Sequence, residues 1–415
     1  QITVPDANVE YRVAIGERQG STYEVHVGTA LDGVDILEEV VTGGGNSAFA
    51  FTPTTDTFWI KILNDVRDTT VELSVVSVIS TTLQSDFDTP WEEEDLRDLH
   101  GVMLAGGTTL YFCHPNYPVY KITYVRLTDS FVFEEVTFVE KPTQWQGENW
   151  PRTGIYHEGR LWFGGTPNEP QTFWGSKSGQ PENFTIGSLA DDAIVFTLSD
   201  RGEIRWMQST KNMLIGTTLS ENIVSSAEGI ITPGDIQVTQ QSAYGSNTVQ
   251  SIQVGDQIFY ASADNSKLRA MQYEWSADNW LSQDLTFFSE HITNSGIRAT
   301  AWAQNPDNQF LCLLENGTMA ALTYERGENI FGWHKHDIGN EIKDIATARV
   351  DGKDLMMALV NRQPGKLYLE LIPIDQPLVF MDSWVEKTLV PETATIDGLD
   401  HLEGREVQVL IDGAV

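Results

Sequence analysis

The chain has 415 residues, of which 40% are hydrophobic and 20% charged, the composition of a folded protein with room for more than one domain. Lys and Arg number 26 against 59 Asp and Glu, which gives a net charge of −33. Such a surface repels nucleic-acid phosphates and anionic lipid headgroups, so it argues against a protein that reads DNA sequence or coats a membrane.

Residues 1–84 are predicted to form a β-sandwich. Apolar and polar residues alternate in VEYRVAIG, STYEVHVGTA, FWIKIL and VELSVVSV, and turn-rich stretches separate these runs. We expect Gly43–Gly45 with Asn46 to form a loop tip. Residues 85–98 then break the pattern with Pro90 and a run of carboxylates, which indicates an acidic linker with one helical turn from Trp91.

Residues 99–384 contain a repeat, which predicts a β-propeller of about six four-stranded blades. A tight turn is followed by an apolar strand, a second turn and another strand. The first turns are expected at Gly106, Gly159, Lys211, Gly255, Asp307 and Gly352, and the second turns at Asn116, Pro167, Ser220, Asp264, Asn316 and Pro364. The predicted closing strands include FVFEEVTF, AIVFTLS, LTFFSEHI and LVFMDSW. A closed ring is favoured because it leaves no blade unpaired.

Residues 385–415 leave the repeat and are predicted to begin a small C-terminal β-barrel or sandwich module, cut short at Val415. The chain begins at Gln1 rather than Met, so we expect it to be part of a longer protein. Neither a secretory signal peptide nor an apolar run long enough to span a bilayer is recognisable in the sequence.

One stretch, RLWFGGTPNEPQTFWGSKSGQPENF over Arg160–Phe184, resembles the tail nozzle (tail tubular protein B-like) family of short-tailed bacteriophages and prophages. The resemblance continues through HPNYPVYKI, IRWMQSTKNMLIGT, LTFFSEHIT, LTYERGENIFGWHKH and LDHLEGREVQVL, and it covers roughly residues 87–415. From this resemblance we expect the family's usual N-terminal portion to be missing before Gln1, and residues 1–84 to be a lineage-specific insertion.

The resemblance implies a virion structural protein without catalytic residues or cofactors. It implies a hexameric conduit in the phage tail, assembled with adaptor or portal-proximal proteins and with tail fibres or spikes, through which genomic DNA passes without specific binding. An acidic channel wall would suit that role, because no Lys or Arg contacts to phosphate would have to break as the duplex moves. The alternative is a phage tail protein that binds a receptor or polysaccharide, or cleaves a polysaccharide.

Several residues could carry chemistry, and for each the structural interpretation is preferred. His334-Lys335-His336-Asp337 places two histidines on one strand face, but no third metal ligand is identifiable. Asp191-Asp192 and the run Glu92–Asp95 could serve glycoside hydrolysis or calcium binding, yet they lack the spacing of a calcium loop, so solvated turn carboxylates are favoured.

The remaining candidates are glycines, aromatic residues and cysteines. Gly43–Gly45 and Gly164-Gly165 lack the helix and Lys of a phosphate-binding loop. Sugar-stacking platforms are less favoured than blade core for the aromatic residues Tyr111, Trp162, Trp174, Trp206 and Phe259. Cys113 and Cys312 lie in apolar runs and are expected to be buried hydrophobes, because two cysteines so far apart form neither a disulfide framework nor a zinc motif. No Ser/His/Asp or Cys/His nucleophile arrangement has local support.

Overall fold

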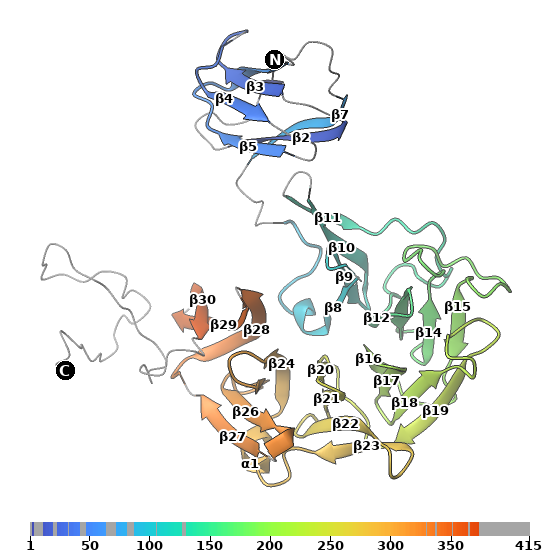
Figure 1. The fold of residues 1–415 in the computed structure, drawn as a ribbon. Helices are drawn as coiled ribbons and strands as arrows, with labels where there is room; N and C mark the ends of the chain where they lie inside the picture. Colours follow the sequence, from blue (N-terminus) through green and yellow to red (C-terminus); the bar gives the residue numbers. More distant parts are fainter. Residues whose placement is uncertain are drawn as a thin grey trace, which may run out of the picture. The chain divides into compact units, whose positions relative to one another are not determined.

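The fold is known from a computed structural model (Figure 1). It describes residues 2–3, 11–19, 23–31, 33–41, 47–63, 72–80, 87–104, 106–126, 130–328, 330–336, 338–350, 352–363 and 366–372. The chain divides into two compact units. The first comprises Gln1–Glu94, Met103–Phe112 and Val119–Val136, and the second comprises Asp95–Val102, Cys113–Pro118 and Thr137–Val415.

The N-terminal part of the first unit contains two antiparallel sheets with a common core. One sheet has the order β1-β6-β3-β4, with β1 at Ile2–Thr3, β6 at Thr57–Leu63, β3 at Tyr23–Gly28 and β4 at Leu37–Val41. The other has the order β5-β2-β7, with β5 at Ser47–Phe51, β2 at Tyr11–Gln19 and β7 at Glu72–Ser80. Val13 of β2 and Val25 of β3 are fully buried in the same apolar cluster, because alternate residues of each strand point to one face. Four of these strands coincide with the predicted alternating runs, whereas β1, β4 and β5 were not predicted.

The next sheet has the order β11-β10-β9-β8, with β8 at His100–Met103, β9 at Thr109–His114, β10 at Tyr117–Val125 and β11 at Ser130–Glu135. In the first unit, Trp91 packs on the aromatic side chains of these strands, with its ring centroid 5.5 Å from that of Phe112 and 5.8 Å from that of Phe133. The segment predicted as an acidic linker is therefore anchored by a nearly buried indole. Its helical turn is the 3-10 helix η1, Asp95–Asp98, which begins four residues after Trp91.

The second unit continues with five further sheets in chain order (Figure 1). The sheet β12–β15 consists of Thr153–His157, Arg160–Gly164, Thr172–Gly175 and Ile194–Thr197, and β16–β19 of Ile204–Ser209, Met213–Thr217, Glu221–Ser225 and Gln237–Ser242. The sheet β20–β23 consists of Ile252–Val254, Gln257–Ala261, Leu268–Glu274 and Asn279–Asp284, and β24–β27 of Ile297–Ala303, Gln309–Leu314, Met319–Glu325 and Ile330–His336. The last sheet, β28–β30, consists of Glu341–Val350, Lys353–Gln363 and Lys366–Ile372. Short helices α1, Glu290–Thr293, and η2, Arg326–Glu328, lie in the connections.

Consecutive sheets of the second unit share apolar cores, because their central strands are apolar on both faces. In β17, Met213 and Ile215 lie in the cluster shared with the preceding sheet, and Leu214 lies in the cluster shared with the following one. Strand β25 repeats this pattern, with Cys312 on one face and Leu313 on the other. Successive residues of such a strand face two different apolar cores, so every position is apolar. This explains why the sequence shows a continuous apolar run after each turn. The all-β prediction is confirmed, and the serial packing of mostly four-stranded antiparallel sheets is consistent with a propeller-like arrangement.

All six predicted first turns lie between the first and second strands of their sheets. Four of them contain glycines with positive φ, namely Gly106 at 103°, Gly159 at 73°, Gly255 at 63° and Gly352 at 79°. In this region of backbone space a residue with a Cβ is strained. The predicted second turns are also confirmed, because they lie between the second and third strands of their sheets. The exception is Pro364, which lies outside the described residues.

One predicted closing strand is wrong. LTFFSEHI, over Leu285–Ile292, is a turn followed by α1, and the fourth strand of that sheet is β23 just before it. The reason is Asp284, whose carboxylate accepts hydrogen bonds from the backbone N–H and the hydroxyl of Thr286 at 2.8 and 2.7 Å and so turns the chain. The predicted strand LVFMDSW, the C-terminal module over 385–415 and the loop tip at Gly43–Gly45 lie outside the described residues.

Candidate functional site

The aromatic residues considered as sugar platforms are core residues. Relative exposure is 2% or less for Tyr111, Trp162, Trp174, Trp206 and Phe259. This burial confirms that they are core residues, and a ligand cannot reach any of these rings. Cys113 and Cys312 are also fully buried, and burial raises the pKa of both thiols far above the ordinary value.

The histidine pair lies on the outer strand β27. The rings of His334 and His336 are 4.9 Å apart between centroids, edge to face, and burial lowers the pKa of His334. Asp337 falls outside the described part of the chain. Among the residues that the structure describes, no group of three His, Cys, Asp or Glu side chains is placed to hold a metal ion.

The acidic pair at Asp191-Asp192 is only partly solvated, so the prediction of solvated carboxylates is wrong for one of its members. Asp191 is exposed, but Asp192 is buried and accepts hydrogen bonds from Lys177 Nζ at 2.7 Å and from the Leu189 N–H at 2.9 Å. These two bonds lower the pKa of Asp192. In the other acidic run, Glu92–Glu94 are exposed, as predicted. Asp95 is half-buried, and its carboxylate accepts a 2.7 Å hydrogen bond from the Tyr117 hydroxyl.

Arg160 organises the stretch that carries the family resemblance. Its side chain is 3% exposed, and its guanidinium donates to the carbonyl oxygens of Ser176 and Asp192, both at 2.7 Å, and to those of Ala190 and Asp191 at 2.5 and 3.3 Å. Arg160 thereby fastens the long connection between β14 and β15 to the start of β13. Gly165, which directly follows the end of β13, has φ 64° and lies in the connection that leads to β14, so its role is conformational.

A serine, a histidine and a carboxylate meet at the ends of β12 and β16, a juxtaposition that the sequence did not reveal. His157 Nδ1 lies 2.8 Å from Ser209 Oγ, and His157 Nε2 lies 3.8 Å from Glu158 Oε1. The second separation exceeds a hydrogen bond, and the other oxygen of Glu158 accepts the Ile231 N–H at 2.8 Å. The carboxylate therefore does not orient the imidazole as a nucleophilic triad requires, and the group connects three loops instead.

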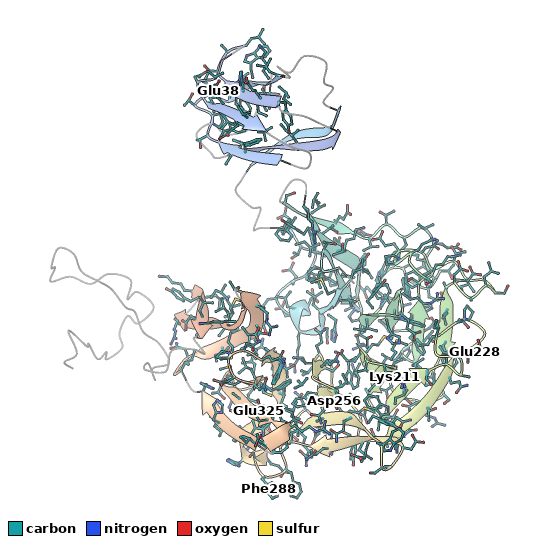
Figure 2. All side chains as sticks on the ribbon, viewed as in Figure 1. Glu38, Lys211, Glu228, Asp256, Phe288 and Glu325 are labelled. Atoms are coloured by element: carbon teal, nitrogen blue, oxygen red, sulfur yellow. The ribbon has the colours of Figure 1, made fainter. Side chains whose placement is uncertain are left out.

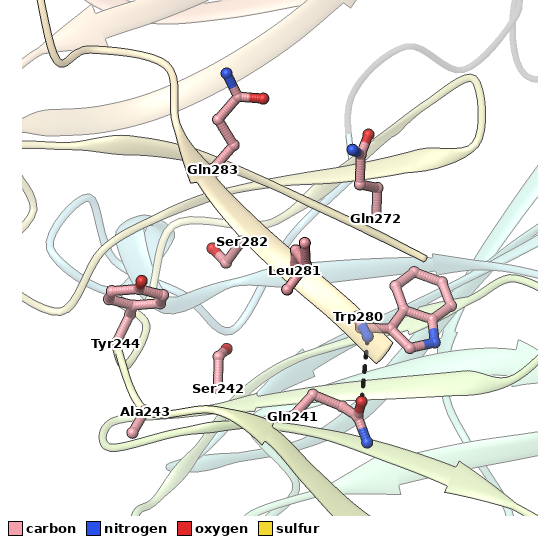
Figure 3. A pocket seen from close by; sticks show the side chains of 9 residues that line it. All are labelled: Gln241, Ser242, Ala243, Tyr244, Gln272, Trp280, Leu281, Ser282 and Gln283. Atoms are coloured by element: carbon pink, nitrogen blue, oxygen red, sulfur yellow. Dashed lines mark hydrogen bonds between the residues drawn. The ribbon is translucent and has the colours of Figure 1, made fainter. Parts of the chain in front are cut away.

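An open groove of about 620 Å³ lies between the outer strands β19 and β23 of adjacent sheets, at the end of β22 (Figure 3). Gln241, Ser242, Tyr244 and Ser282 line one side of it, whereas the side chains of Gln272 and Gln283 project to the opposite side of β23 (Figure 3), where Gln272 Oε1 accepts a hydrogen bond from Gln257. The Trp280 indole closes one end, and the backbone N–H of Trp280 donates to Gln241 Oε1 at 3.3 Å. The lining contains no Asp, Glu, Lys, Arg or His side chain.

Buried polar groups support the groove from below. Glu221 is fully buried and accepts hydrogen bonds from the hydroxyls of Ser242 and Ser246, and burial raises the pKa of this carboxyl. The guanidinium of Arg269 lies 3.5 Å from the centroid of the Tyr244 ring and donates to the carbonyl of Ser282 at 3.3 Å. The sequence did not indicate this site, because polar residues are expected on any outer strand that faces solvent.

Comparison of the chain with models of known protein families and with characterised proteins finds no match. Within the described residues no helix has the length and apolar character needed to cross a membrane.

Proposed function

We propose that this chain is a virion structural protein, a subunit of the tail nozzle of a short-tailed bacteriophage. The observation that supports this proposal is the use made of the family-like stretch Arg160–Phe184. Its distinctive side chains Arg160, Trp162 and Trp174 are buried in hydrogen bonding and packing. In an enzyme, the characteristic side chains must reach a substrate. Here the characteristic side chains are buried and hold the fold together, which favours a structural protein.

The finer architecture belongs to the same proposal. Serial packing through shared cores favours a propeller of six blades, in which β28–β30 is the last blade. The common core of the two N-terminal sheets favours a β-sandwich over residues 1–84. We propose that six copies form the conduit and contact adaptor or portal-proximal proteins and tail fibres or spikes, and that the chain resides in the phage tail.

The charge of the chain favours passage of DNA without binding. With a net charge of −33, and with exposed carboxylates such as Glu228 (Figure 2), the surface repels the duplex. The rival function, cleavage of polysaccharide, needs two carboxyl groups beside the scissile bond, and the lining of the groove between β19 and β23 supplies none.

Electron microscopy of virions with a gold-labelled antibody against this chain tests the proposal. We expect label at the distal end of the short tail, in six-fold averages. Label confined to the capsid, or six-fold tails that lack the chain, would overturn it. A gel-shift assay with duplex DNA at low salt is expected to show no retarded species, and stable complexes would contradict passage without binding.

A further inference from the structure

A short segment of the second unit, residues 95–102, connects parts of that unit that are far apart in the sequence. It contains η1 and the start of β8. Arg97 forms an ion pair with Glu315, which directly follows β25. The imidazole of His100 donates a hydrogen bond to the carbonyl oxygen of Thr248, just before β20, at 3.1 Å. We call residues 95–102 the latch, because they join the sheet of β20 to the sheet of β25.

Two imidazoles at the latch are buried in their neutral form. His100 is 3% exposed and His114 is 2% exposed. A carbonyl can only accept, so His100 Nε2 carries the proton donated to Thr248, and its Nδ1 has no hydrogen-bond partner among the residues that the structure describes. His114 Nδ1 accepts the N–H of Asn116 at 3.2 Å, and the ring donates to the backbone carbonyl of Asp95. Both rings therefore hold the latch as uncharged groups.

A second proton on either ring would break this arrangement. On His114 it would occupy Nδ1, so the Asn116 N–H would lose its acceptor. On His100 it would create a buried donor at an atom for which the described part of the chain offers no acceptor. Protonation therefore weakens the attachment of the latch at both imidazoles.

The charges around the two rings do not offset this cost. The charged groups that face one or both rings come from the latch and from the residue before β12: Asp95, Asp98 and Arg152. The carboxylates favour protonation, whereas the guanidinium opposes it, and the two imidazoles would repel each other if both were charged. Thr248, which accepts the bond from His100, carries no charge. Burial has the largest effect, and it lowers the pKa of His100 from 6.5 to about 4 and also lowers the pKa of His114.

We propose that the latch is released by acid, because protonation of His100 and His114 detaches residues 95–102 from the sheets of β20 and β25 while those sheets stay folded. The released imidazoles regain their ordinary pKa, so the open state binds more protons than the closed state. The latch is thus fully closed above pH 6.5 and loosens as the pH falls toward 4. The latch lies within one chain and does not depend on the conduit function.

Hydrogen–deuterium exchange of the full chain at pH 7 and pH 5, followed by mass spectrometry, tests this proposal. Exchange rates are corrected for the intrinsic pH dependence of amide exchange, so the remaining difference reports the open fraction. Peptides that span the latch are the reporter. Peptides that span β13 are the reference, because every residue of that strand is buried. Thermal melting of each variant establishes that it is folded.

Three variants separate proton sensing from simple attachment. His100→Gln supplies an amide donor in place of the imidazole and does not titrate. His291→Gln is the matched control, because His291 is exposed on α1. Gln250→Ala removes an uncharged attachment, the 3.2 Å hydrogen bond from the Gln250 amide to the carbonyl of Gly101.

In the parent chain, His100 alone should make the latch exchange about twentyfold faster at pH 5 than at pH 7, and His114 should add to this acceleration. The β13 peptides should change by less than about threefold. The acceleration should be about twentyfold smaller in His100→Gln than in the parent chain, and unaltered in His291→Gln. Gln250→Ala should raise exchange of the latch by about threefold at both pH values and leave the acceleration unchanged.

The proposal is overturned if the latch of the parent chain exchanges equally fast at both pH values, or if His100→Gln accelerates as much as the parent. Equal acceleration of the β13 peptides would also overturn it, because the acid would then unfold the whole unit. If melting shows that His100→Gln is unfolded, His114→Gln takes its place. An acceleration in that variant as large as in the parent chain would refute the role of the imidazoles.

Discussion

Replacement of Arg160 by Met tests the claim that this buried cation holds the family-like stretch together. The change removes donors from the Ser176 and Asp192 carbonyls, each bonded at 2.7 Å inside the protein. Leaving a buried acceptor without its donor costs about 2 kcal/mol, so the two carbonyls together account for about 4 kcal/mol. The other two carbonyls belong to exposed residues and regain water, so they add little. We expect the variant to lose about 4 kcal/mol of unfolding free energy.

Urea denaturation followed by tryptophan fluorescence measures this loss, because Trp162 and Trp174 are buried in the same sheet. A loss of this size should lower the urea midpoint by about 1–2 M. Arg160→Lys should fall between, since an ammonium lacks the planar fork of donors. The exposed Arg201 provides the control, and Arg201→Met should stay within about 0.5 kcal/mol of the parent chain. If Arg160→Met shifts the midpoint no more than the control does, the reasoning fails.

Three further predictions concern the second unit and its sheets. The pKa of Asp354 is held at about 2, below 3.8, by a guanidinium and two backbone N–H groups, so its contribution to stability is present above pH 3.8 and is lost as the pH falls toward 2. Asp354→Asn should flatten that acid limb in melting curves, and an unchanged limb would refute this. Gly216→Ala should destabilise the fold by about 3 kcal/mol or more in urea titrations, because the new Cβ would lie 2.1 Å from a buried indole. Gly234→Ala, with nothing within 4 Å, should be near neutral. Ellman's reagent should label neither Cys113 nor Cys312 until urea unfolds the chain, whereas rapid labelling of folded protein would contradict their burial.

Sequence reasoning located the repeat because its signals are local. The turn itself requires a glycine, because Gly159 has a φ of 73°. The strand after the turn must be apolar along its whole length, because both of its faces are buried. The errors arose where a local contact overrides the pattern, as at Asp284, or where a short strand such as Leu37–Val41 carries two glutamates among its five residues.

The candidate sites were less accessible to such reasoning. The groove between β19 and β23 brings Tyr244, just after β19, near Ser282 of β23, and neither segment of the sequence indicates that the other lies beside it. The contact between His157 and Ser209 has the same origin, since it spans 52 positions of the chain. By contrast, the residues that looked most functional in the sequence, such as Trp162, are buried packing residues.

The strand β30 has a consequence for the behaviour of the isolated protein in solution. Leu367, Leu369 and Leu371 project from its exposed side with 54%, 70% and 61% of their surface accessible, and in the part of the chain that the structure describes β30 pairs only with β29. An apolar edge of this kind is adhesive. The charge of −33 keeps like molecules apart in dilute buffer, and added salt shortens the reach of that repulsion to about 10 Å at 0.1 M. An increase in ionic strength weakens most complexes held by charge, but it should promote the association of these molecules.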